Sequence, residues 1–290
     1  MAIRKITVSR DESIYEAWPD VAMTNSGKLI AIFTECEHHL NRDKSRLVLK
    51  ESYDRGETWG EKIFFSERED GGSQHTVSGK PHYNCARIGK LKSGKMYIIC
   101  DRIYGQEYLK SEIYVWIGNE EGTEWGEPIL VPLTGIVPDK ITELESGRII
   151  VSAHFGNFEN NNKLTQYLVY SDDDMKTWSK PQIFDDIGVL PHLQPLKCGV
   201  TLASYGRPIL KVRATSDSSG MQWQDPIRIP LSCNDVPNNW NGSNSCFYTG
   251  MIAYSDNEAL LVYSDFNCKN QQNETVKSIL CRKITVVFDD

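Results

Sequence analysis

Four acidic residues stand where apolar strand patterns meet polar connections. They are Asp20, Asp101, Asp139 and Glu37. Cleavage of a glycosidic bond commonly uses two carboxyl groups, one protonated with a raised pKa and one ionised. Crowding of like charges raises one pKa, whereas a neighbouring arginine lowers another. These four residues are therefore the candidate catalytic groups of a glycoside hydrolase.

Basic and aromatic residues fall in the same short windows. The candidate substrate-binding residues are Arg87, Arg102, Arg207, His38, His39, His82, His154, His192, Trp18 and Tyr248. Five of the six histidines lie in these windows, all except His75. Guanidinium groups can bind a sugar carboxylate bidentately. Arg87, on a strand predicted to face inward, needs a partner, which we expect to be a ligand or an active-site carboxylate. These residue types favour hydrolysis of an acidic or deoxy sugar linkage.

Two other functions use the same residue types. A polysaccharide lyase would take a histidine as base and a tyrosine as acid, and the residues available are His82, His154 or His192 with Tyr248. A non-catalytic sugar-binding protein would keep the aromatic and arginine contacts without needing paired carboxylates. Because no compact ligand spacing such as H-E-x-x-H occurs, the sequence predicts no metal site and no cofactor.

The elements that position these residues are marked by a repeated turn motif. Residues 52–59 read S-Y-D-R-G-E-T-W, and residues 171–178 keep all of the pattern S-x-D-x-G-x-T-W except the glycine. Residues 216–223 lack the threonine, and residues 118–125 are the most divergent copy. In each hairpin we expect the aspartate to accept hydrogen bonds from its own turn and the tryptophan to pack between sheets.

A strand repeat precedes each turn motif. It consists of a strand with a polar start, a Ser-Gly or similar turn, and an apolar strand. The copies span 20–32, 87–100 and 139–153, with fainter copies at 196–205 and 251–263. No amphipathic helix is predicted. The sequence therefore predicts an all-β protein with about four strands per repeat.

The strand count predicts a β-propeller of five blades in one domain, residues 1–290, with a six-bladed ring as the alternative. The repeats begin near Pro19, His82, Val137, Gly188 and Ser245. The last repeat has three strands of its own, so we expect residues 3–8 to pair with the strand near 278–287 and close the ring. In such a blade the first strand starts, and the second ends, at the same end of the central channel. The candidate residues occupy these positions.

The turn motifs resemble the Asp boxes of the sialidase superfamily, whose members are β-propeller glycosidases and related carbohydrate-active proteins. The resemblance covers nearly the whole chain as a fold signal and identifies architecture rather than reaction. The chain departs from the catalytic pattern of true sialidases, because Ala17 stands where their first carboxylate-binding arginine belongs. Arg207 resembles the second of those arginines. Asp43 is close to the place of the family's acid, about two residues short in spacing. The resemblance thus implies a divergent member that is not a typical sialidase.

Composition limits the partners. The 290 residues carry a net charge of −7 without a basic stripe, so no nucleic-acid partner is expected. No apolar run approaches the ~20 residues of a membrane span, and no secretory signal is apparent. The eight cysteines are scattered, which favours reduced thiols in a cytoplasmic protein. The expected partner is a carbohydrate, and the sequence does not indicate an oligomeric state.

Overall fold

The computed structural model describes most of the chain. The described residues are 7–9, 11, 13–38, 41–72, 79–104, 107–157, 163–206, 209–229, 249–253, 255–269 and 271–288. Within them every regular element is a β-strand. By their contacts the strands form two compact units, Met1–Ile141 and Thr142–Asp290.

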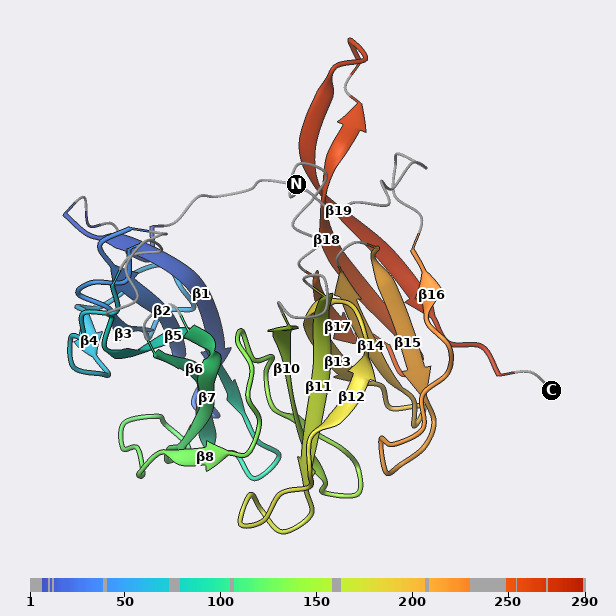
Figure 1. The fold of residues 1–290 in the computed structure, drawn as a ribbon, viewed down its shortest axis with the longest axis horizontal. Helices are drawn as coiled ribbons and strands as arrows, with labels where there is room; N and C mark the ends of the chain where they lie inside the picture. The colour runs from blue at the N-terminus through green and yellow to red at the C-terminus, as the bar shows by residue number, and fades with distance from the viewer. Residues whose placement is uncertain are drawn as a thin grey trace. The chain divides into compact units, whose positions relative to one another are not determined.

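The first unit contains two antiparallel sheets, each with its strands in sequence order (Figure 1). Sheet 1 consists of β1 (Tyr15–Met23), β2 (Leu29–Cys36), β3 (Arg46–Ser52) and β4 (Ile63–Phe64). Sheet 2 consists of β5 (Pro81–Lys90), β6 (Met96–Tyr104), β7 (Glu107–Ile117) and β8 (Ile129–Val131). The short segment after β8 leads to the second unit.

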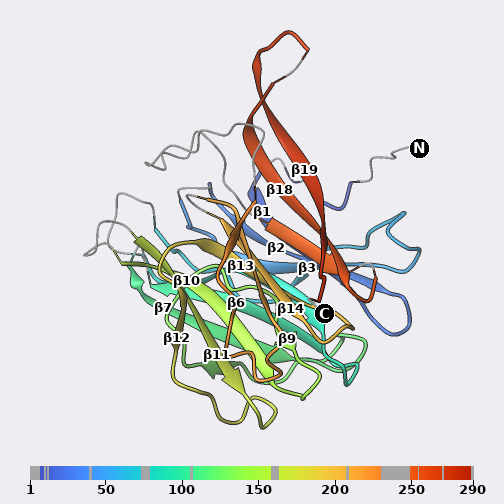
Figure 2. The same ribbon diagram turned by 90° about the vertical axis from the view of Figure 1, so that its right-hand side faces the viewer.

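The second unit contains three antiparallel sheets, again in sequence order. Sheet 3 consists of β9 (Thr142–Glu143), β10 (Ile149–Asn157), β11 (Lys163–Ser171) and β12 (Gln182–Asp185). Sheet 4 consists of β13 (Val189–Pro195), β14 (Thr201–Gly206), β15 (Lys211–Thr215) and β16 (Ile227–Arg228). Sheet 5 consists of β17 (Thr249–Ala253), β18 (Glu258–Lys269) and β19 (Thr275–Thr285), and β18 and β19 continue beyond β17 as a long hairpin (Figure 2).

The second strands are the most buried because apolar residues follow one another along them. In β2 every residue after Leu29 is buried. Ile32 of β2 packs with Ile88 of β5 and Ile98 of β6 in the core between sheets 1 and 2. Similar cores join sheet 3 to sheet 4 and sheet 4 to sheet 5. Burial on both faces explains why these strands read as continuous apolar runs.

The turn motifs are held by their own residues. Asp54 Oδ1 accepts the backbone N–H of Thr58 at 2.9 Å, and Oδ2 accepts its hydroxyl at 2.6 Å. Asp173 makes the same two contacts with Thr177 at 2.8 and 2.6 Å. At the glycine position Gly56 has φ +88°, and Met175, which replaces it in the other copy, has φ +66°. The motif therefore builds a hairpin turn and needs no distant partner.

The predictions of an all-β fold and of five repeated sheets are confirmed. Sheets 1 to 4 begin close to the predicted starts of the repeats. Ser245 and residues 3–6 lie outside the described residues, so the pairing of the N-terminal strand with sheet 5 stays a prediction, as does the single domain.

Candidate active site

One backbone feature recurs in the first strands of sheets 1, 2 and 4 and in the segment before β9. Trp18, Cys85, Val137 and Leu190 have left-handed backbones, with φ of +54°, +47°, +51° and +47°. Strand pairing shifts register around three of them, between Ala17 and Asp20, between Asn84 and Arg87, and between Val189 and His192. A non-glycine residue in this region costs on the order of 1–3 kcal/mol, so the surrounding structure must hold it there. We call these four the left-handed residues.

Four predicted site residues follow the left-handed residues at a fixed distance. They are Asp20, Arg87, Asp139 and His192, each two positions later. Proline stands between them in three cases, and Ala86 takes its place in the second. The local backbone therefore places one polar residue at an equivalent position in β1, β5, β13 and the segment before β9.

Asp20 is fixed by contacts from two other parts of the first unit. Its Oδ2 accepts the backbone N–H of Ile88 at 3.0 Å, and its Oδ1 lies 3.1 Å from Nζ of Lys140. Lys140 follows Asp139, which is 3% exposed. Burial, and after it the negative charges of Asp139 and Asp20, raise the pKa of the Tyr97 hydroxyl. Tyr97 thus lies near both carboxylates, which the structure brings to one region.

Asp101 is the most deeply buried of the predicted acids. Its side chain is 0% exposed, and its Oδ2 accepts the backbone N–H of Val137 at 2.8 Å. Its Oδ1 has no hydrogen-bond partner among the described residues. Burial raises the pKa of this carboxyl to about 7, although the Val137 N–H and the charges of Arg42 and Arg87 lower it. Asp101 can therefore hold and release a proton near neutral pH.

Two arginines near Asp101 have no carboxylate partner in the described part of the chain. The Arg42 guanidinium lies 4.0 Å from the centre of the Trp18 ring, and its Nη1 is 3.6 Å from Sγ of Cys36. The Arg87 Nη1 reaches only the carbonyl of Ala86, at 3.5 Å. The predicted carboxylate partner of Arg87 is thus absent from the described residues. Arg42 was not among the predicted binding residues, although it follows the second strand of the first repeat, at the end of the blade where the site was expected.

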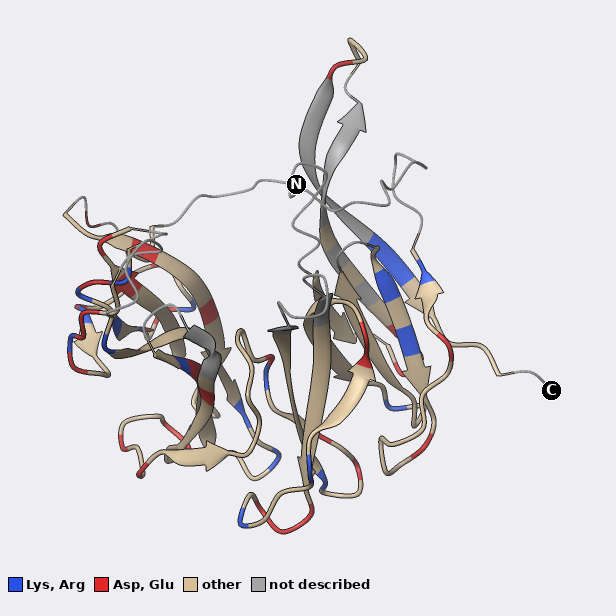
Figure 3. Cartoon of the chain, in the orientation of Figure 1, with Lys and Arg blue, Asp and Glu red and all other residues tan. Residues whose placement is uncertain are grey.

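Several other basic residues are paired with carboxylates. Figure 3 shows Lys and Arg along β15 and β19 of the second unit. Of these, Lys211 pairs with Asp185 at 3.1 Å and Lys283 with Glu258 at 2.9 Å. Arg102, a predicted binding residue, lies 3.5 Å from Glu69 and over the ring of Tyr83. Arg42 and Arg87 are distinguished from these residues by the lack of such a partner.

His82 and Asn84 lie beside Asp101 on sheet 2. Asn84 pairs with Asp101 across β5 and β6, and its side-chain Oδ1 is buried without a partner. The Nδ1 of His82 lies 3.2 Å from the carbonyl of Lys80, whereas its Nε2 has no partner among the described residues. Burial lowers the pKa of the His82 imidazole to about 4, so the ring is neutral at pH 7.

Two predicted residues lie at the connection after β2. Glu37 is 39% exposed and forms an ion pair with Lys44. The His38 ring lies 5.9 Å from that of Tyr15. Asp43, which stands close to the position of the acid in the sialidase superfamily, accepts the backbone N–H of Gly72 at 2.8 Å. None of these contacts joins them to Asp101.

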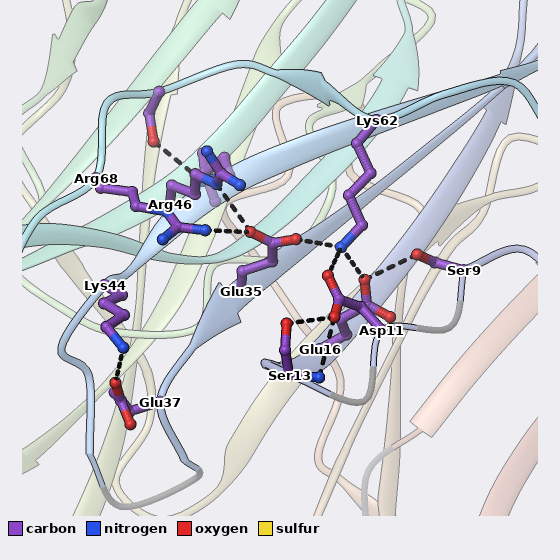
Figure 4. Close-up of polar contacts among 12 residues, drawn as sticks. Ser9, Asp11, Ser13, Glu16, Glu35, Glu37, Lys44, Arg46, Lys62 and Arg68 are labelled. Carbon is purple, nitrogen blue, oxygen red and sulfur yellow. Dashed lines mark hydrogen bonds and ion pairs between the residues drawn. The ribbon is translucent and has the colours of Figure 1, made fainter.

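Sheet 1 contains a second charged cluster, whose residues were not among the predicted site residues (Figure 4). Glu35, which is 0% exposed, lies 2.8 Å from Nε of Arg46 and 2.5 Å from Nζ of Lys62. Lys62 also pairs with Glu16 at 2.7 Å and with Asp11 at 2.9 Å. Burial lowers the pKa of Lys62, but hydrogen bonds to its three carboxylate partners raise it above the usual value. The sequence signal for Glu35 was its place near the end of the second strand of the first repeat.

The remaining predicted residues belong to the second unit or lie outside the described residues. His154 is 4% exposed, and its Nδ1 accepts the backbone N–H of Leu190 at 3.4 Å. His192 Nε2 lies 2.9 Å from the carbonyl of Met251. Arg207, His39 and Tyr248 lie outside the described residues.

A cavity of about 670 Å³ lies against the first strand of sheet 1. Asp20 and Glu16 contribute its acidic groups, and Phe33 and Trp59 contribute aromatic rings. Over the described ranges, no group of three or more His, Cys, Asp or Glu side chains is arranged to hold a metal ion. The same residues include no helix long and apolar enough to cross a membrane.

Solved structures match this chain along nearly its whole length. A protein of unknown function from Dyadobacter fermentans gives a TM-score of 0.63 at 17% identity, covering 97% of this chain and 85% of that one. A mutant NanB sialidase from Streptococcus pneumoniae gives a TM-score of 0.66 at 13% identity, and the match covers 96% of this chain and 60% of the sialidase chain. The chain is a sialidase-like β-propeller. A family 117 glycoside hydrolase from Zobellia galactanivorans matches the propeller with a TM-score of 0.56 at 13% identity, covering 99% and 91%.

The comparisons define the fold and not the reaction. No family model matches the sequence, and neither does any curated protein. The propeller spans 60% of the length of the sialidase chain from Streptococcus pneumoniae. At 17% identity or less, a shared propeller leaves the chemistry to be argued from the site.

Proposed function

We propose that the propeller is a glycoside hydrolase that acts on an acidic or deoxy sugar, with Asp101 as general acid. The observation that carries this proposal is the buried Asp101 carboxyl, whose Oδ1 has no partner among the described residues and whose pKa burial raises to about 7. A general acid works best when its pKa lies near the working pH. Asp101 then protonates the leaving-group oxygen through Oδ1.

The second carboxylate of the proposed reaction is Asp20 or Asp139. Lys140 lies beside Asp20 as a counter-ion at 3.1 Å, and Asp139 precedes Lys140 in the chain. One of these carboxylates stabilises the oxocarbenium-like transition state, as nucleophile or as base for water.

Arg42 and Arg87 supply the positive charge for an anionic substituent of the sugar. Neither has a carboxylate partner in the described part of the chain. A carbohydrate substrate is supported by the similar folds of sialidases, a family 117 glycoside hydrolase and an α-L-arabinanase. The arginines favour the acidic member of the acidic-or-deoxy pair.

The test is hydrolysis of aryl glycosides of uronic, sialic and deoxy sugars by the wild type and by Asp101→Asn. The asparagine keeps an acceptor for the Val137 N–H, so the fold should survive while turnover falls by roughly 10²–10⁴-fold. Aryl groups that leave without protonation should partly restore activity in this variant. Asp172→Asn, at a carboxylate 57% exposed in its ion pair with Arg148, is the matched control. Sugar binding without turnover would refute the hydrolase and indicate a sugar-binding propeller.

A polysaccharide lyase is the second candidate, and His82 is the observation that favours it. Its imidazole is neutral at pH 7, and its Nε2 has no partner among the described residues. A neutral imidazole can remove the proton next to a uronate carboxylate. Elimination leaves a carbon–carbon double bond, so an ultraviolet-absorbing product that disappears in His82→Ala would favour the lyase over the hydrolase.

A further inference from the structure

An equivalent contact occurs once in each unit, between Asp101 of β6 and Val137 in the segment before β9, and between His154 of β10 and Leu190 of β13. The sixth residue of the second strand is Asp101 in β6 and His154 in β10. Asp101 Oδ2 accepts the N–H of Val137 at 2.8 Å, and His154 Nδ1 accepts the N–H of Leu190 at 3.4 Å. A carboxylate and an imidazole thus occupy equivalent positions and each accept one backbone hydrogen bond.

Both N–H donors belong to residues whose backbones need support. Val137 and Leu190 have φ of +51° and +47°. For a β-branched or bulky side chain, this region is a true outlier. The strand register is interrupted at Leu190, and its side chain is only 6% exposed. A buried N–H without an acceptor would add the cost of an unmade hydrogen bond to the backbone strain.

The backbone conformation of Val137 and Leu190 determines the path of the two residues that follow each of them. Pro138 and Pro191 come directly after Val137 and Leu190, and proline holds its own φ near −65°. Asp139 and His192 are next in the chain. Fixing the left-handed residue therefore fixes where the side chain two positions later projects.

We propose that Asp101 and His154 are equivalent positioning residues: Asp101 holds Val137, His154 holds Leu190, and each so sets the direction of the side chain two positions later, Asp139 or His192. The backbone part of this proposal stands on the contacts alone. Its consequence for turnover rests on the proposed function. Asp101 has an oxygen for each task, since Oδ2 binds Val137 and Oδ1 is left for proton transfer.

Sheet 1 provides an internal comparison. Thr34 is the sixth residue of β2, and Cys85 is the left-handed residue of the following sheet. The Thr34 hydroxyl is buried but has no hydrogen-bond partner among the described residues. Thr34→Val is isosteric and removes an unused hydroxyl, so it serves as the matched control for changes at Asp101 and His154.

The experiment is amide hydrogen exchange, followed by NMR with selective labelling of valine, leucine and cysteine. In the wild type the Val137 and Leu190 amides should be protected from exchange. Asp101→Leu should speed exchange at Val137, and His154→Leu at Leu190, by about tenfold each, as expected for one hydrogen bond. Asp101→Asn and His154→Asn keep an acceptor in reach and should retain the protection. Thr34→Val should leave the Cys85 amide unchanged.

Unprotected Val137 and Leu190 amides in the wild type would overturn the proposal even if a leucine variant failed to fold. Equal exchange in the leucine and asparagine variants would also overturn it. If no sugar is hydrolysed but the amides behave as expected, only the proposed function fails.

Discussion

Nζ of Lys140 lies 3.1 Å from Oδ1 of Asp20, and it also donates to the carbonyl of Val21 at 3.2 Å. The contact joins the segment before β9 to the first strand of sheet 1, although 119 positions separate Lys140 from Val21. The other oxygen of Asp20 accepts the N–H of Ile88 in sheet 2. Two other segments of the first unit therefore fix this carboxylate.

Asp20→Asn should remove most hydrolytic activity and leave stability nearly unchanged. The asparagine carbonyl can still accept the Ile88 N–H, and the lost ion pair, 35% exposed at Lys140, contributes about 1 kcal/mol at most. Turnover should fall by about 10²-fold or more if Asp20 is the second carboxylate. Kinetics and urea unfolding of the same samples check both parts. If Asp20→Asn has the kcat of the wild type, Asp139 is the second carboxylate instead.

Asp101 should make folding stability fall as pH rises from about 4 to about 7. The unfolded chain releases this proton near the usual carboxyl pKa of 3.8, whereas burial keeps it on the folded protein up to about 7. The slope for one proton is about 1.4 kcal/mol per pH unit, and no further loss from this group follows above pH 7. Four other groups face Asp101, namely the charges of Arg42 and Arg87 and the thiols of Cys85 and Cys100. They are present in both the wild type and Asp101→Asn, so a difference in pH dependence between the two proteins is assigned to Asp101.

Urea unfolding of the wild type and Asp101→Asn at several pH values measures this difference. The folding stability of the asparagine variant should rise relative to that of the wild type as the pH rises. A constant difference across the range would show that Asp101 titrates normally in the folded protein.

The turn aspartates should have the opposite dependence on pH. Hydrogen bonds from Thr58 hold the pKa of Asp54 at about 2, and those from Thr177 do the same for Asp173. Their contribution is present above the unfolded pKa of 3.8 and is lost as the pH falls to about 2. Asp54→Asn should therefore lower Tm at pH 7 more than at pH 2, without changing activity. Melting curves over this range provide the measurement, and equal losses at both ends would contradict it.

Removal of Glu35 should destabilise sheet 1 strongly. Glu35→Ala leaves Arg46 and Lys62 without their buried counter-charge, and breaking such a pair from one side typically costs about 3–5 kcal/mol. Lys62→Met alone leaves Glu35 with Arg46 and should cost less. A double-mutant cycle between Glu35 and Lys62, measured by chemical denaturation, gives their coupling. Additive single losses would mean that the two charges do not interact.

The sequence by itself determined the hairpin turns and the repeated sheets. In residues 52–59 the aspartate, glycine and threonine contact one another, so the pattern contains every partner that the turn needs. The apolar second strands and their spacing were enough to predict five sheets. The sequence also identified Asp20, Asp101 and Asp139 as polar residues at strand ends. It could do so because the signals that mark the ends of a strand, apolar alternation and turn residues, extend over only a few positions.

Only the tertiary structure decided the surroundings of these acids. The acceptor for Val137 lies 36 residues away in Asp101, and the left-handed backbone of Val137 has no local signal such as glycine. Tertiary contacts likewise separate Arg42, which no carboxylate contacts in the described residues, from Arg102, which is paired with Glu69. The reason is physical: hydrogen bonds within a turn depend on neighbours in the chain, whereas burial and counter-charge depend on strands that meet only in the folded protein.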